Sequence, residues 1–216
     1  MLVRALMLLL LLLPPPTAAA GRITLDGITF AEGSDNFRLL GATGSGTLED
    51  PFVVIEEIVG DGEVVLSVSV DSAEFGSRIR TMHAVGFALH KVVINRTDRI
   101  WDYFALELEF EPGQGSDYYD GLSFGQAATV NRPFQSNRFG RVEDMTEPRD
   151  MIRFTEGRVG PGDRAAFSVA ITHTGVLPQF FLVQHVRPPF AQLQGPIRLA
   201  ECAPIGATTE RPTCRR

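Results

Sequence analysis

Apolar and polar residues alternate with a period of two in several separate stretches of this chain. One row of alternate apolar residues falls within residues 64–70, and a second falls within residues 104–110, where Tyr103, Glu107 and Glu109 take the opposite register. Successive side chains of a β-strand point to opposite faces of a sheet, so this period predicts strands with one buried face. No stretch keeps helical spacing for three turns. The sequence therefore predicts an all-β protein.

Clusters of glycine and proline separate the predicted strands, as in Glu111-Pro112-Gly113 and Gly160-Pro161-Gly162. Short strands between such turns are typical of antiparallel sandwiches and barrels. We expect a single antiparallel β-sandwich of about seven to nine strands over residues 21–200. Residues 33–51 are interpreted as a long connection, and residues 113–150 show little regular pattern. The remaining strands are expected at residues 23–30, 52–58, 87–94, 166–171 and 179–186.

The start of the chain has the three parts of a secretory signal peptide. Arg4 is followed by an apolar run that ends at Leu13, and small residues, Ala18 to Ala20, precede Gly21. This pattern predicts a signal peptide over residues 1–20, with cleavage before Gly21. The apolar run is shorter than the roughly 20 residues that a membrane-spanning helix needs. We therefore expect a secreted or periplasmic protein with no membrane-spanning segment in the mature chain.

Charge and cysteine content restrict the expected partners. The formal net charge of −6 argues against nucleic acid, because a protein that binds phosphate backbones presents a dense basic surface. The two cysteines, Cys202 and Cys214, predict one disulfide in an exported chain. Their bond would close a small loop in a C-terminal tail of residues 201–216, and would leave the core unlinked.

Three segments together resemble exported bacterial β-sandwich domains that often precede a C-terminal sorting tail. They are residues 101–108, the run Asp120-Gly121-Leu122-Ser123-Phe124, and residues 158–163 before the strand at 167–169. The resemblance covers roughly residues 101–171 and implies a fold, not an activity. The chain departs from the pattern because it ends in Cys214-Arg215-Arg216 with no apolar tail, so anchoring is not implied.

Gly121-Leu122-Ser123-Phe124-Gly125 matches the G-x-S-x-G motif of serine hydrolases. Candidate acids and histidines follow it in the order that such a triad requires. However, the motif works only where a strained turn joins a strand to a following helix, and Pro133 leaves no room for that helix. We predict a plain turn and strand here, and keep an esterase as an alternative. The candidate partners are Asp144, Asp150, Asp163, His173 and His185.

Carboxylates and aromatic residues suggest two further kinds of site. Asp117 and Asp120, on a glycine-rich loop, are candidate ligands of a structural calcium ion, which takes six to eight oxygen atoms. The alternative is that they are solvated loop acids. The candidate residues for binding a carbohydrate or a partner are the aromatic residues Trp101, Tyr103, Tyr118 and Tyr119.

Glu107 and Glu109 share the strand face of Tyr103, and paired carboxylates in a cleft can hydrolyse glycosides. A solvent-facing sheet surface gives the same pattern, and we expect Glu107 to face solvent. The sequence as a whole favours a non-enzymatic binding or structural protein of the bacterial envelope with no cofactor beyond a possible calcium ion. Its partner would be an envelope or extracellular protein or a glycan. The alternatives are a secreted esterase, a glycoside hydrolase or a carbohydrate-binding module.

Overall fold

A computed structural model describes residues 21–71, 75–117, 119–125 and 134–188, and these residues form strands and loops without a helix. The all-β prediction is confirmed for this part of the chain. Tyr118, Cys202, Cys214 and the expected signal peptide lie outside the described residues. The strands are β1 (Arg22–Leu25), β2 (Ile28–Glu32), β3 (Phe37–Thr43), β4 (Phe52–Ile58), β5 (Val64–Val70), β6 (Val85–Asn95), β7 (Phe104–Glu111), β8 (Gln114–Gly115), β9 (Leu122–Phe124), β10 (Gln135–Ser136), β11 (Phe139–Met145), β12 (Met151–Gly157), β13 (Arg164–His173) and β14 (Gln179–His185).

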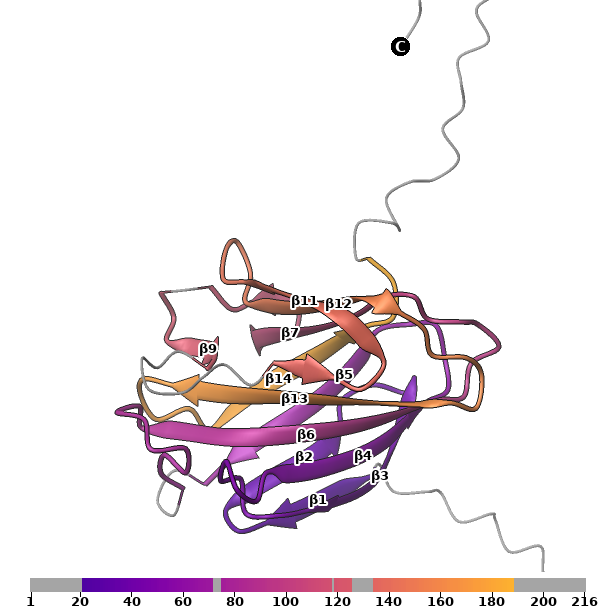
Figure 1. Cartoon of the computed structure of the whole chain (residues 1–216). Coiled ribbons are helices and arrows are strands. Elements are labelled where there is room, and N and C mark those ends of the chain that lie inside the picture. The colour runs from indigo at the N-terminus through magenta and orange to yellow at the C-terminus, as the bar shows by residue number, and fades with distance from the viewer. Residues whose placement is uncertain (1–20, 72–74, 118, 126–133, 189–216) are drawn as a thin grey trace, which may run out of the picture.

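The strands form two sheets, which we call sheet A and sheet B. Sheet A has eight strands in the order β1-β2-β5-β14-β7-β12-β11, with β8 paired to β7. Sheet B has six strands in the order β10-β13-β6-β4-β3, with β9 paired to β13. All neighbours are antiparallel except β4 and β6, which run parallel. Figure 1 shows β13, β6 and β4 of sheet B in front of β14, β5 and β2 of sheet A.

A single large apolar cluster joins the facing sides of the two sheets. Phe104 of β7 stacks on Phe167 of β13, with ring centroids 4.2 Å apart, and Phe87 of β6 lies 6.4 Å from Phe180 of β14. Burial of each such side chain contributes about 1.5–3 kcal/mol relative to exposure. The two sheets thus have a sandwich-like arrangement, held together by aromatic residues from alternate positions of the strands.

The strand predictions at residues 52–58 and 64–70 agree with β4 and β5. Residues 23–30 instead form parts of the β1–β2 hairpin, which turns at Asp26 and Gly27 with φ of 46° and 81°. The expected connection at residues 33–51 contains β3, and the unpatterned stretch at 113–150 contains β11. The strands therefore outnumber the seven to nine that were expected. Most of the added strands are short or lie at sheet edges, where one face carries too few apolar residues to produce a clear period; β12, of seven residues, lies inside sheet A between β7 and β11.

An ion pair lies within the core between the sheets. Lys91 of β6, the sole lysine of the chain, pairs with Glu56 of β4, and both side chains have 0% exposure. Burial lowers the pKa of Lys91, and the Glu56 carboxylate opposes this shift. The ion pair therefore links two parallel strands through charges that have no contact with solvent.

The parallel pairing of β4 and β6 brings two loops to the same end of the molecule. The loop of residues 59–63 follows β4, and the loop of residues 96–103 follows β6. Strand β14 also finishes at this end, because its Gln184 pairs with Val64 at the start of β5. We call this the Asp61 end.

Candidate functional site

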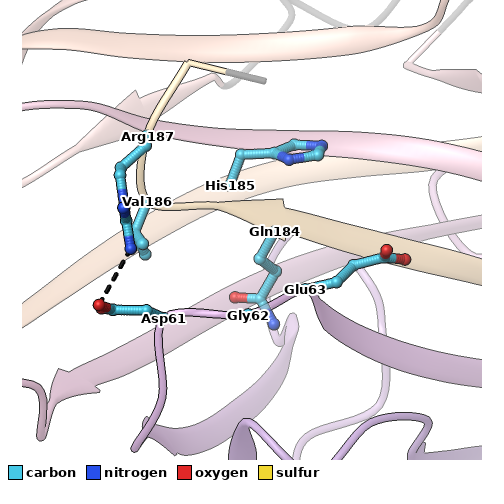
Figure 2. A pocket seen from close by; sticks show the side chains of 7 residues that line it. All are labelled: Asp61, Gly62, Glu63, Gln184, His185, Val186 and Arg187. Carbon is cyan, nitrogen blue, oxygen red and sulfur yellow. Dashed lines mark ion pairs between the residues drawn. The ribbon is translucent and has the colours of Figure 1, made fainter. Parts of the chain in front are cut away.

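Two adjacent pockets open at the Asp61 end, and we call them together the end groove. The first has a volume of about 310 Å³ and the second about 200 Å³. Asp61, Val186 and Arg187 belong to both pockets. Figure 2 shows the first pocket. It is also lined by Gly62, Glu63, Gln184 and His185, and the second is also lined by Arg99, Ile100, Trp101 and Asp102.

Asn36 fixes the loop that carries Asp61. Its backbone carbonyl accepts hydrogen bonds from the N–H groups of Val59 and Gly60, and its side-chain amide donates to the Glu63 carbonyl at 2.9 Å. The loop passes so close to Asn36 that a Cβ atom at Gly62 would lie 2.4 Å from the Asn36 amide nitrogen. A side chain at position 62 would therefore displace the Asn36 amide from Glu63, and these contacts hold Asp61 at the rim of the groove.

Asn95, at the end of β6, fixes the loop on the other side. Its buried side chain donates to the carbonyls of Arg99 and Val159, at 2.7 and 3.1 Å, and accepts from Thr97. Trp101 then forms a pair of backbone hydrogen bonds with Val159, at 3.0 and 2.9 Å. These contacts place the Arg99 and Trp101 side chains against the second pocket.

Asp61 links its own loop to the loop of residues 96–103 and to the end of β14, because its carboxylate forms ion pairs with Arg99 and Arg187. Its Oδ2 atom lies 3.0 Å from Arg99 Nε and 3.0 Å from an Arg187 terminal nitrogen. All three side chains are partly exposed, so these ion pairs are weak, at about 0–1 kcal/mol each. The groove is therefore bridged by two ion pairs that add little to the stability of the fold.

The amide of Gln184 has no hydrogen-bond partner among the described residues, although the residue is only 2% exposed. Figure 2 shows this side chain extending from β14 toward the Asp61–Gly62 segment, whereas the side chains of Glu63 and His185 turn away. The indole N–H of Trp101 is likewise buried without a partner. Buried polar groups are nearly always paired, so each of these atoms requires an explanation.

The described aromatic candidates, Trp101, Tyr103 and Tyr119, do not form a common surface. Trp101 and Tyr103 are 2% and 7% exposed, so neither presents a ring face on which a sugar could stack. Tyr103 packs with Ala105 and Met151 on the outer side of sheet A, while Tyr119 is exposed. Trp101 does line the end groove, as a buried wall.

Asp117 and Asp120 bind their own turn. The Asp117 carboxylate accepts from the N–H groups of Tyr119 and Asp120, and the Asp120 carboxylate accepts from Asp117 and Leu122. Within the described ranges, no group of three or more His, Cys, Asp or Glu side chains is placed to hold a metal ion. The two carboxylates thus stabilise a turn, and their geometry gives no support to the calcium expectation.

The expectation that Glu107 faces solvent is wrong. Its carboxylate has no exposed surface, and it accepts from Arg149 and from His185 Nε2, both at 2.8 Å. Burial raises the pKa of Glu107, but its hydrogen bonds to His185 and Arg149 outweigh this and hold that pKa below its ordinary value. Glu109 is also buried, and its pKa is raised by that burial. Glu107 and Glu109 therefore do not line an open cleft.

Ser123 lies in strand β9, and its side chain is buried. The structure brings Asp150 near it, but both are almost fully buried and neither lines the end groove. His173 is held by the backbone of Gly175, and His185 by Glu107. The candidate triad members are therefore not assembled around Ser123.

Sequence reasoning named Trp101 and His185 but missed the other groove residues, although one signal was present. In the strand at residues 179–186, Gln184 occupies the register of Phe180 and Leu182, both of which are in the core. A polar residue at an apolar position of an alternating strand indicates a buried polar group. Asp61 precedes a glycine, which by itself indicates only a turn, and Arg187 follows the strand in sequence but meets Asp61 only in the folded protein.

Residues 21–71, 75–117, 119–125 and 134–188 contain no helix that is long and apolar enough to cross a membrane. Comparisons of the chain with protein-family models, with curated proteins and with solved structures found no match.

Proposed function

We propose that this protein is an exported, non-enzymatic binding protein of the bacterial envelope, and that its ligand binds in the end groove. The observation that carries this proposal is the unpartnered amide of Gln184, which lies in the first pocket at 2% exposure. An unsatisfied buried polar group costs about 1–3 kcal/mol. A ligand that pairs with this amide would offset that cost in the bound state.

The residues of the groove favour binding over catalysis. Asp61 is the carboxylate shared by both pockets, and it is paired with two arginines, which makes it a poor general base. The hydrogen bond to Glu107 of β7 orients the His185 ring, and Figure 2 shows this ring directed away from the pocket. Among the described residues that line the two pockets there is no serine, threonine or cysteine. A hydroxyl or thiol nucleophile beside a base is therefore lacking among these residues.

The test uses the intrinsic fluorescence of Trp101, which is the only tryptophan of the chain and lines the groove. The mature protein is titrated with fractions extracted from the envelope of the bacterium that makes it. We expect a saturable change in emission for the wild type and for Gln179→Met, a control at the opposite end of β14. The change should be lost in Gln184→Met. Equal responses of all three proteins, or no response to any fraction, would contradict the proposal.

A further inference from the structure

We propose that the ligand of the end groove is a neutral saccharide of one or two sugar rings. This inference rests on the proposed function and names the chemical class of the ligand. It follows from three properties of the groove: the balance of its charges, the mixture of its hydrogen-bond donors and acceptors, and the size and apolar content of its walls.

Four of the five acidic and arginine side chains that line the groove balance in charge. Asp61 and Asp102 stand against Arg99 and Arg187, and Asp61 already pairs with both arginines at 3.0 Å. The fifth, Glu63, turns away from the pocket in Figure 2. An anionic ligand would approach the two aspartates and would compete with Asp61 for the guanidinium groups. A cationic ligand would meet the two arginines. A neutral ligand avoids both penalties, because it leaves the ion pairs intact.

The free hydrogen-bonding atoms include donors and an acceptor. The Gln184 amide offers an NH₂ donor and a carbonyl acceptor, and the Trp101 indole offers one N–H donor. Both side chains are 2% exposed, so water has little access to them. A hydroxyl group donates and accepts at once, and vicinal hydroxyls can pair with both ends of one amide. A polyhydroxylated ligand therefore satisfies a set of atoms that a simple acceptor would satisfy only in part.

The size of the groove and its walls agree with this class of ligand. The first pocket, at about 310 Å³, lies at the lower end of the range of small-molecule sites, which is about 300–1,000 Å³. Val186 and Ile100 supply apolar surface beside the polar atoms, and Trp101 forms a buried wall of the second pocket. The C–H faces of a sugar ring can pack on such surface while its hydroxyls reach the polar groups. The smaller second pocket extends the site toward a second ring.

The experiment is a titration of ¹⁵N-labelled mature protein followed by amide correlation spectra. Trp101 gives a single indole N–H signal, because the chain has one tryptophan. The neutral probes are glucose, galactose, N-acetylglucosamine, maltose and cellobiose, and the anionic probes are succinate and citrate. We expect at least one sugar to shift the Trp101 indole signal and the Gln184 side-chain signals saturably, while the anions leave them in place.

Two variants of β14 test the assignment. Gln184→Met should weaken sugar binding about tenfold or more, equivalent to about 1.4 kcal/mol. Gln179→Met should bind like the wild type, because Gln179 pairs with Ser67 at the far end of the strand. The dispersion of the backbone signals shows directly that each variant is folded.

Every other outcome contradicts either the saccharide inference or the proposed function. No indole shift with any of the five sugars overturns the saccharide inference, and so does a sugar affinity that Gln184→Met leaves unchanged. If only succinate or citrate shifts the indole signal, and Gln184→Met abolishes that shift, the ligand is an anion and the proposed binding function stands. The proposed function itself fails only if the envelope fractions leave the Trp101 emission unchanged or act independently of Gln184.

Discussion

Lys91 and Glu56 form an ion pair between the two sheets, where neither side chain has any exposed surface. Removing one partner of a buried pair leaves an uncompensated charge, which destabilises a protein by about 3–5 kcal/mol. We expect this loss in the free energy of unfolding for Lys91→Met, especially because Glu56 Oε1 already lacks a hydrogen-bond partner. Urea unfolding at pH 7 measures it.

The double variant Lys91→Met/Glu56→Leu provides the control. Apolar residues of similar volume often replace a buried pair without net loss. We therefore expect the double variant to recover most of the stability that the single variant loses. If the two variants are equally unstable, the packing of the lysine side chain matters more than the charge on Glu56.

Neighbouring residues of β7 should both be needed for stability, for different reasons. Leu106→Ala should cost about 2–5 kcal/mol, because it leaves a cavity in the core. Glu107→Ala should cost about 1.5–3 kcal/mol, because hydrogen bonds to charged groups are lost from His185 and Arg149. Thermal and urea unfolding of both variants measure these losses. A Glu107→Ala variant as stable as the wild type would mean that the carboxylate is solvated.

The alternation in β5 and β7 predicted their core-facing residues, because a sheet that packs on another sheet requires one apolar face. The same alternation could not show that Glu107 is buried. Its partners come from β14 and from the segment before β12, and only the sheet order β14-β7-β12 brings them together. Likewise Phe110 continues the apolar row in sequence but is 41% exposed, because β7 is irregular after Glu109 where it pairs with β8.

The end groove was beyond prediction for a similar reason. Asp61, Arg99 and Arg187 come from three loops or strand ends, and they meet because β4 and β6 run parallel, an unusual pairing in an otherwise antiparallel protein. Antiparallel pairing throughout, which the short strands and turns suggested, would place these loops elsewhere. Trp101 was chosen from the sequence as a binding residue and does line the groove, but it is buried there.

Asp150 should make stability depend on pH. Burial raises the pKa of Asp150 from 3.8 to about 6, and the nearby Asp144 charge adds to the rise. The folded protein then binds a proton more tightly than the unfolded chain, so this group's contribution is full below pH 4 and is lost as the pH rises through about 6. We expect Asp150→Asn to be more stable than the wild type at pH 7.5 by roughly 1–3 kcal/mol. The difference should shrink toward pH 4.

Urea unfolding at several pH values checks this prediction, and Asp35→Asn serves as a control on an exposed carboxylate that does not act on Asp150. An Asp150→Asn variant that is less stable than the wild type at pH 7.5 would show that the carboxylate is needed in its charged form.

A fluorophosphonate probe should leave the folded mature protein unlabelled. Ser123 is 1% exposed in a strand, and no histidine contacts its hydroxyl among the described residues, so it lacks an oriented base. Mass spectrometry of the treated protein measures labelling. Stoichiometric labelling that disappears in Ser123→Ala, and falls in His173→Ala or His185→Ala, would support the esterase alternative instead.

Gln184→Met should make the ligand-free protein more stable. The wild-type amide is buried with neither its oxygen nor its nitrogen paired, and such a group costs about 1–3 kcal/mol. Methionine has nearly the same shape and no polar atoms that need a partner, so the free energy of unfolding should rise within that range. Urea unfolding of ligand-free protein measures the change. Gln179→Met should give no such gain, because Gln179 is exposed and donates to Ser67 Oγ at 2.8 Å. A loss of stability in Gln184→Met would mean that the amide is satisfied within the folded protein and serves the fold. A gain in stability combined with a loss of binding would show that this position is kept polar for its ligand.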